Sequence, residues 1–175
     1  HQCGYNNIIL NVTNNISKQI ENLYALGARN FLIPNLPDLG KLPRIFENFS
    51  YLKGQPNERR FIALSNKMTH ISTNHNIVLA AQIRALRTKY PDINITLVDI
   101  AGELARVKVP LSFLEKQISF DGEQASIGQA CFPNYSYFAF RSPEIKLCSK
   151  PHEVFFLDGV HPTTFGHCLL ADRKS

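Results

Sequence analysis

Hydrophobic residues recur along the chain at two spacings, and these spacings predict helices and strands in alternation. Between Val12 and Leu26 an apolar residue returns every three or four positions, which is the period of an amphipathic helix. Gly27 follows, and a glycine directly after a helix suits the left-handed conformation of a C-terminal cap. Residues 30–35 then form a short apolar run typical of a buried parallel strand.

The middle of the chain predicts one long helix. Apolar residues keep a helical spacing from about Glu58 to Tyr90. Within it, Ser72-Thr73-Asn74 is a polar run that could divide the helix into two. His70 and His75 are polar residues in the same stretch, and we expect both on the surface.

The remaining pattern completes an α/β arrangement. Residues 93–100 alternate between apolar and polar positions, which predicts a second strand. Two shorter helices are expected, over 101–107 and 163–173, with Thr163 or Thr164 as N-cap of the second. Strands joined by helical crossovers predict a three-layer α/β fold with a parallel sheet.

Composition agrees with a globular domain. The chain has 175 residues, of which 44% are hydrophobic and 19% charged, enough to bury a core. The net charge of +5 is compatible with contact at an anionic membrane surface, although the lysines and arginines are scattered. They are not interleaved with aromatic residues, so nucleic-acid binding is not expected. No apolar run approaches the length of a membrane-spanning helix.

The C-terminal quarter contains a compact pair of titratable residues. In the segment F-F-L-D-G-V-H-P-T-T, Asp158 and His161 lie three residues apart, with Gly159 between them and Pro162 after them. A carboxylate can hold an imidazole in one tautomer and leave the other ring nitrogen to deprotonate a serine. The alternative is a polar turn in which Asp158 only caps the following helix.

A second segment, G-A-R-N-F-L-I-P-N-L-P-D-L-G at residues 27–40, adds to the first. Together the two strongly resemble the GDSL branch of the SGNH ester hydrolases, in the manner of secreted bacterial lipases, lysophospholipases and acyltransferases. The resemblance covers most of residues 12–172, although residues 43–93 match only in helical pattern. It implies an α/β/α domain with a parallel sheet, and a serine hydrolase that cleaves acyl esters such as phospholipids. Asp158 and His161 would be its orienting acid and its base, without a cofactor or metal.

The family's nucleophile lies in a Gly-Asp-Ser-Leu motif near the N-terminus, and none of the serines in this chain lies in such a motif. The glycine of the family's second motif is also absent. The resemblance therefore implies that residues 1–175 are the C-terminal part of one such domain, and that their sheet is incomplete. We expect a preceding segment to supply the serine, and the chain alone to be inactive. The alternatives are a truncated, non-catalytic paralogue that binds a lipid or a partner, and a plain α/β binding domain.

Gly4-Tyr5-Asn6-Asn7 resembles the family's third motif, Gly-x-Asn-Asp, with Asn in place of Asp. In that motif the Asn side chain donates to the oxyanion, so the resemblance implies the same role for Asn6. The alternative is an Asn-rich turn.

Four cysteines bear on the compartment. Secreted GDSL enzymes carry a similar pair before the D-x-x-H segment, and this resemblance implies a Cys131–Cys148 disulfide and a secreted or extracytoplasmic protein. Two reduced thiols are the alternative. Cys3 and Cys168 are left over, and pair with each other, with further chain or with nothing. No Cys/His spacing typical of zinc is present, so a metal site is not expected.

Other polar and aromatic features have structural explanations beside functional ones. Asp38 shapes a loop or adds a carboxylate to the site, and Asp99 caps a helix or contacts the site. His152 and His167 are not expected to act as the base. The aromatic segment 132–140 lines an acyl pocket or packs as a lid.

The chain also matches the N-glycosylation pattern Asn-x-Ser/Thr at several places. Chance matches are expected in so Asn-rich a sequence, and the pattern matters only in a eukaryotic secretory pathway. The matches are Asn11-Val12-Thr13, Asn48-Phe49-Ser50, Asn94-Ile95-Thr96 and Asn134-Tyr135-Ser136.

Overall fold

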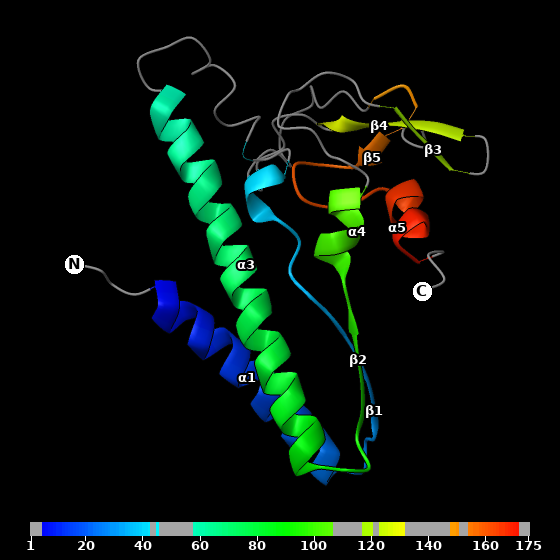
Figure 1. The fold of residues 1–175 in the computed structure, drawn as a ribbon. Helices are drawn as coiled ribbons and strands as arrows, with labels where there is room; N and C mark the ends of the chain where they lie inside the picture. Colours follow the sequence, from blue (N-terminus) through cyan, green and yellow to red (C-terminus); the bar gives the residue numbers. More distant parts are fainter. Residues whose placement is uncertain are drawn as a thin grey trace, which may run out of the picture. The chain divides into compact units, whose positions relative to one another are not determined.

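The computed structural model describes residues 5–42, 45, 58–106, 117–120, 123–131, 148–150 and 154–171. Figure 1 shows helices and strands alternating along the first hundred residues. The chain divides into two compact units. Unit 1 comprises His1–Asp38 with Lys67–Gly102, and unit 2 comprises Leu39–Asn66 with Glu103–Ser175.

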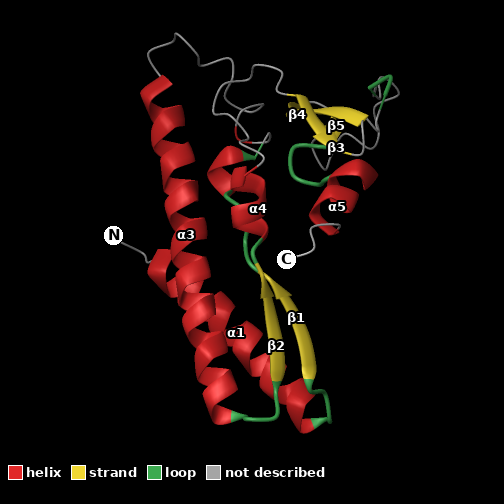
Figure 2. Cartoon of the chain, turned by 45° about the vertical axis from the view of Figure 1, so that its right-hand side comes forward, coloured by secondary structure: helices red, strands yellow, loops and turns green. Residues whose placement is uncertain are grey.

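Unit 1 is a two-stranded parallel sheet with helices on one face. Strand β1 pairs with β2 in a register that runs from Asn30↔Asn94 to Pro34↔Val98. Helices α1 and α3 lie side by side next to these strands (Figure 2). The elements are α1 (Tyr5–Ala25), β1 (Asn30–Pro34), most of α3 (Glu58–Lys89) and β2 (Asn94–Val98). The expected helix–strand–helix–strand order is thus confirmed, with the first helix beginning earlier than the apolar spacing predicts.

The core of unit 1 forms where α1 and α3 meet the inner face of the sheet. The buried core residues come from both helices, from β2 and from the residue just before β2. Phe31 and Ile33 of β1 are partly buried and pack against them. They are Ile20, Leu79, Ile83, Leu86, Ile93 and Ile95. Burying side chains of this size contributes about 1.5–3 kcal/mol each, which holds the helices on the sheet.

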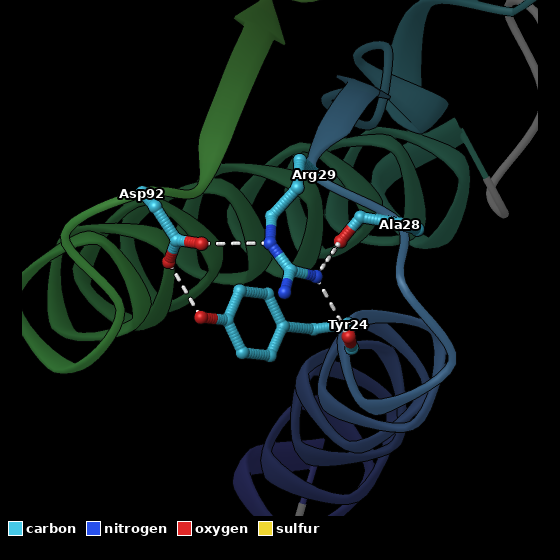
Figure 3. A network of polar contacts seen from close by, with 4 residues as sticks. All are labelled: Tyr24, Ala28, Arg29 and Asp92. Carbon is cyan, nitrogen blue, oxygen red and sulfur yellow. Dashed lines mark hydrogen bonds and ion pairs between the residues drawn. The ribbon is translucent and has the colours of Figure 1, made fainter.

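A polar cluster links the turn between α1 and β1 to the turn between α3 and β2 (Figure 3). Gly27 has φ = 103°, so it provides the expected left-handed cap. Arg29 then reaches Asp92 from Nε to Oδ2 over 2.7 Å, and also donates to the main-chain oxygens of Tyr24 and Ala28. The hydroxyl of Tyr24 donates to the other oxygen of Asp92 over 2.5 Å. The turn after α1 is therefore held to the turn after α3.

Helix α3 is continuous, so the expected break at Ser72-Thr73-Asn74 is wrong. The hydroxyls of Ser72 and Thr73 donate to the carbonyls of Met68 and Thr69, one turn back, over 2.9 and 3.0 Å. Because these hydroxyls bond to carbonyls of the same helix, they do not draw the backbone into a turn, and the helix continues through them.

His75 is buried, and its expected place on the surface is wrong. It lies three residues after the buried Ser72 and four before the buried Leu79, so helical geometry places it on the inward face of α3. Its Nδ1 lies 3.1 Å from Oδ1 of Asn76. The exposed His70 does lie on the surface, as expected.

Unit 2 contains a three-stranded mixed sheet in the order β3-β4-β5. Strands β3 (Gln117–Phe120) and β4 (Glu123–Ala130) pair antiparallel, and β4 pairs parallel with β5 (Val154–Phe156). Unit 2 also contains the short η1 (Leu39–Lys41), most of α4 (Ile100–Arg106) and α5 (Thr164–Ala171). The antiparallel β3–β4 pair was not expected from the sequence, although the sequence between Phe120 and Glu123 is Asp-Gly, a pair typical of tight hairpin turns.

The α/β class is confirmed, because in the described part of the chain the parallel strands β1 and β2 are joined by helix α3. The antiparallel β3–β4 pair adds to the parallel sheet that was expected. No helix among the described residues is both long and apolar enough to cross a membrane.

Candidate active site

The candidate site in unit 2 is a tight turn between β5 and α5, closed on both sides by backbone hydrogen bonds. Leu157 N–H donates to the carbonyl of His161 over 2.7 Å, and Thr163 N–H donates to the carbonyl of Phe155 over 2.9 Å. Phe156 and Pro162 form an isolated antiparallel bridge. The chain therefore folds back on itself around residues 158–160.

Asp158 and His161 meet inside this turn. Oδ2 of Asp158 lies 2.7 Å from Nδ1 of His161, and Oδ1 accepts the main-chain N–H groups of Val160 and His161, each over 2.7 Å. The Asp158 side chain is 14% exposed and the His161 side chain 72% exposed. A carboxylate accepts hydrogen bonds only, so the neutral imidazole must carry its proton on Nδ1. Nε2 is then the nitrogen with a free lone pair.

The surroundings of Asp158 favour its charged form. Partial burial acts to raise the pKa of this carboxyl. The hydrogen bonds from the main chain of His161, from its ring and from the main chain of Val160 outweigh burial, and the pKa is lowered. Asp158 therefore stays an acceptor for the imidazole at neutral pH.

Thr163 fastens the turn to the strand before it and to the helix after it. Its Oγ1 donates to the carbonyl of Val154 over 2.7 Å and accepts the N–H of Gly166 over 3.1 Å. The second bond is that of an N-cap, so the expectation that Thr163 caps the last helix is confirmed. The alternative in which Asp158 is the helix cap does not hold, since Asp158 contacts only its own turn among the bonds of the described residues.

Two buried aromatic rings and a close approach of α5 support the turn from below. The rings of Phe155 and Phe156 are fully buried and meet edge to face, with centroids 4.8 Å apart. A Cβ on Gly166 would lie 2.6 Å from the carbonyl oxygen of Phe155 and 2.8 Å from Cβ of Pro162. Only glycine allows α5 to approach the turn this closely.

A disulfide joins Cys131 and Cys148 beside the same strand, and this is the pair that the resemblance implies. Cys131 N–H donates to the carbonyl of Phe156 over 2.9 Å, so the bridge is attached to β5 two residues before Asp158. Cys168 is exposed and carries a free thiol. Cys3 lies outside the described residues.

The other carboxylates singled out in the sequence have structural partners. Asp38 accepts a hydrogen bond from Thr69 Oγ1 over 2.7 Å, which fastens the loop after β1 to α3. Asp99 follows β2 and accepts the N–H of Gly102 over 2.9 Å, which makes it the N-cap of α4. Asn35 donates to the same oxygen of Asp99 over 2.7 Å, so the ends of both strands are tied together.

Asn76, a residue that the sequence analysis did not select, holds the loop after β1 in place. Its amide accepts the main-chain N–H of Leu36 over 2.9 Å and donates to the Leu36 carbonyl over 2.8 Å. This pairing copies the pattern of a neighbouring strand. Nothing in the helical spacing of Asn76 signals that role, because the partner lies 40 positions away.

Asn6 lies in the first turn of α1, with an exposed side chain. It is therefore part of a helix and not of an Asn-rich turn. His167 is exposed on α5, while His152 and the aromatic segment 132–140 lie outside the described residues. Among the described residues, no three His, Cys, Asp or Glu side chains are grouped so that they could hold a metal ion.

Comparisons with known proteins agree with the two sequence motifs. The model of the GDSL-like lipase/acylhydrolase family matches residues 4–173. A GDSL esterase/lipase of Arabidopsis thaliana is 28% identical over 160 residues, which cover 87% of this chain and 38% of the relative. The chain thus spans well under half the length of the curated relative that it matches.

Proposed function

The chain belongs to the GDSL-like lipase/acylhydrolase family, and on this basis we propose that it provides the acid–base pair of a serine hydrolase that cleaves acyl esters. The observation that carries the proposal is the 2.7 Å contact between Asp158 Oδ2 and His161 Nδ1, inside a turn that leaves the imidazole 72% exposed. A base that must reach a substrate needs this combination of a fixed ring and an open second nitrogen.

The proposed reaction uses His161 twice. Its Nε2 first removes the proton of a serine hydroxyl as the oxygen attacks the ester carbonyl, and then delivers that proton to the leaving alcohol. The resulting acyl-enzyme is cleaved by water, or by another alcohol in an acyl transfer, with His161 again as the base. Asp158 stabilises the imidazolium that forms in each half-reaction. The lowered pKa of Asp158 supports this role, because the carboxylate remains charged throughout.

The nucleophile is proposed to lie outside residues 1–175. None of the serines in this sequence lies in a Gly-Asp-Ser-Leu motif, and the chain covers 38% of the Arabidopsis relative. The chain alone is then inactive, because His161 without a serine could activate only water.

Three further parts of the proposal rest on the resemblance. The Asn6 side chain donates to the oxyanion once the domain is complete. The substrates are acyl esters of the phospholipid or lysophospholipid type, reached at a membrane surface. The protein acts in a secreted or extracytoplasmic location, and the Cys131–Cys148 disulfide supports an oxidising compartment.

The experiment that tests the proposal compares turnover of p-nitrophenyl acyl esters by the full-length protein and by variants. His161→Ala is expected to lower kcat by about 10⁴-fold or more, since the serine loses its base. His167→Ala is the matched control, because it removes an exposed imidazole six residues away on α5 and should leave kcat unchanged. Full activity of His161→Ala would contradict the proposed role.

A second candidate function is favoured by the missing nucleophile motif. In this case the protein is a non-catalytic relative that binds a lipid or a partner protein. The two are separated by the intact mass and N-terminal sequence of the natural protein, followed by an ester assay. A protein with no Gly-Asp-Ser-Leu segment and no turnover would support the binding function, whereas turnover that depends on His161 supports the hydrolase.

A further inference from the structure

Cys131 attaches to β5 from two directions, through its main chain and through its side chain. It follows β4 directly and is buried, with an exposed fraction of 1%. Its main-chain N–H donates to the carbonyl of Phe156, the last residue of β5, over 2.9 Å. Its side chain forms the disulfide with Cys148, which precedes the start of β5 at Val154. The segment before β5 and the end of β5 are therefore both fastened to Cys131.

The disulfide is the stronger of the two links between Cys131 and Cys148. The two residues lie 17 positions apart in sequence. Within the described residues, one main-chain hydrogen bond accompanies the covalent bond, from Cys148 N–H to the Cys131 carbonyl over 3.1 Å. A single hydrogen bond stabilises less than the conformational entropy cost of closing a loop of this length, whereas a covalent bond removes most of that cost. Opening the S–S bond therefore leaves the segment before β5 with a much weaker attachment.

Phe156 carries this constraint into the turn that contains the candidate base. Its carbonyl accepts the N–H of Cys131, and the same residue forms the isolated bridge with Pro162, which directly follows His161. The next residue, Leu157, donates its N–H to the His161 carbonyl over 2.7 Å. The main chain of His161 is thus held by the strand whose place depends on Cys131.

We propose that the Cys131–Cys148 disulfide is a positioning group for the Asp158–His161 pair, an inference that rests on the proposed hydrolase function. With the bond closed, β5 holds the turn so that Asp158 Oδ2 stays 2.7 Å from Nδ1 of His161. With the bond open, β5 and the turn gain freedom, and Nε2 of His161 is no longer kept in line with a serine hydroxyl. Because the disulfide does not touch the substrate, its loss lowers kcat and leaves KM unchanged.

The same bond makes the site sensitive to redox conditions. A dithiol reductant opens it by thiol–disulfide exchange. The S–S bond breaks, two electrons and two protons pass to the two cysteine sulfurs, and the reductant is oxidised to a cyclic disulfide. Activity is then greatest in an oxidising compartment, where the protein disulfide persists.

The test compares the full-length wild-type protein with Cys148→Ser, which removes the bond but leaves the buried sulfur of Cys131 in place. For a p-nitrophenyl acyl ester, kcat is expected to fall about 10- to 100-fold at unchanged KM. Nitrogen-15 NMR should show the Nδ1–H tautomer of His161 in the wild type and a mixture of tautomers in the variant. Cys168→Ser removes the free thiol on α5 and is the matched control, expected to change neither readout.

Reversible reduction of the folded wild-type protein gives a second comparison, which does not require the variant to fold. Alkylation and mass spectrometry of one sample verify that Cys131 and Cys148 have become thiols. In a second sample, kcat should fall by the same factor as in Cys148→Ser and should recover on reoxidation. The reductant should lower the kcat of Cys148→Ser no further, because the bond through which it acts is already absent.

Two results would overturn the inference. One is a folded protein without the disulfide that keeps the kcat and the His161 ring signals of the wild type. The other is a fall in kcat with unchanged ring signals, since the disulfide would then act at another place. Failure of the proposed function is a separate result, in which His161→Ala retains full turnover. The ring signals decide the positioning role even then, because they are measured without substrate.

Discussion

Asp158 accepts two hydrogen bonds of 2.7 Å from His161, one at Oδ1 from the main-chain N–H and one at Oδ2 from Nδ1 of the ring. One carboxylate thus shapes the turn with one oxygen and orients the imidazole with the other. The two tasks can be separated by substitution, because an amide can replace the first oxygen but offers a donor in place of the second.

Asp158→Asn is therefore expected to keep the turn and change the tautomer of His161. The Asn oxygen can still accept the backbone N–H groups, while its NH₂ faces Nδ1 and favours the proton on Nε2. Nitrogen-15 NMR of the imidazole should show the Nδ1–H form in the wild type and the Nε2–H form in the variant. Activity of the full-length protein should fall by about 10⁴-fold. An unchanged tautomer with full activity would show that Asp158 does not orient the ring.

Thr163 is expected to act as a positioning residue for this pair. Thr163→Val removes the hydroxyl that bonds to Val154 and Gly166, which should cost about 1–2 kcal/mol of unfolding free energy. Thr163→Ser keeps the hydroxyl and should recover most of this loss. Urea unfolding measures the free energy, and the ring NMR signals of His161 report on the geometry. A Val variant as stable as the Ser variant would mean that the cap contributes nothing.

Gly102 and Asp99 are expected to be coupled. A Cβ on Gly102 would overlap Oδ2 of Asp99, so Gly102→Ala must displace the carboxylate that caps α4 and bonds to Asn35. Loss of these bonds exceeds the helix propensity gained by alanine, and we expect a net destabilisation of about 1 kcal/mol.

The matched control is a double-mutant cycle with Asp99→Ala. Without the carboxylate, the added methyl group at position 102 meets no obstacle from Asp99, and Gly102→Ala should become neutral or stabilising. Equal effects of Gly102→Ala in both backgrounds would contradict the coupling.

The cluster around Asp92 predicts a loss of stability in acid. The hydroxyl of Tyr24 contributes most to a pKa of Asp92 below its ordinary value of 3.8, and loss of hydration acts in the opposite direction. Arg29 lowers this pKa further. Since the unfolded chain binds the proton more readily, the stabilisation is present above about pH 4 and is lost as the pH falls through the folded pKa.

Urea unfolding between pH 6 and pH 2.5 measures this contribution. Asp92→Asn should remove it, and Tyr24→Phe should reduce it while keeping the aromatic contact with Tyr90, whose ring centroid lies 4.3 Å away. A pH dependence identical in all three proteins would show that the cluster does not contribute.

Local signals were sufficient for much of the fold. Gly27 marks the end of α1 because few other residues adopt a positive φ cheaply, and Thr163 marks the start of α5 because its hydroxyl satisfies an N–H that the helix leaves free. The contact between Asp158 and His161 is also local, since a three-residue spacing in a tight turn brings the two side chains together. The same reasoning could have predicted the antiparallel pairing of β3 with β4, because the sequence between them, Asp-Gly, is an equally short-range signal.

Long-range packing settled what the local pattern left open. His75 has the polarity of a surface residue, yet its position between Ser72 and Leu79 turns it inward once α3 packs against α1 and the sheet. Asn76 holds Leu36 across 40 positions, and Gly102 is required only because Asp99 lies against it. Arg29 and Asp92 lie 63 positions apart, so the local sequence pattern around either residue cannot predict their contact. Turns and caps depend on neighbours along the chain, whereas burial and these polar contacts depend on which surfaces meet after folding.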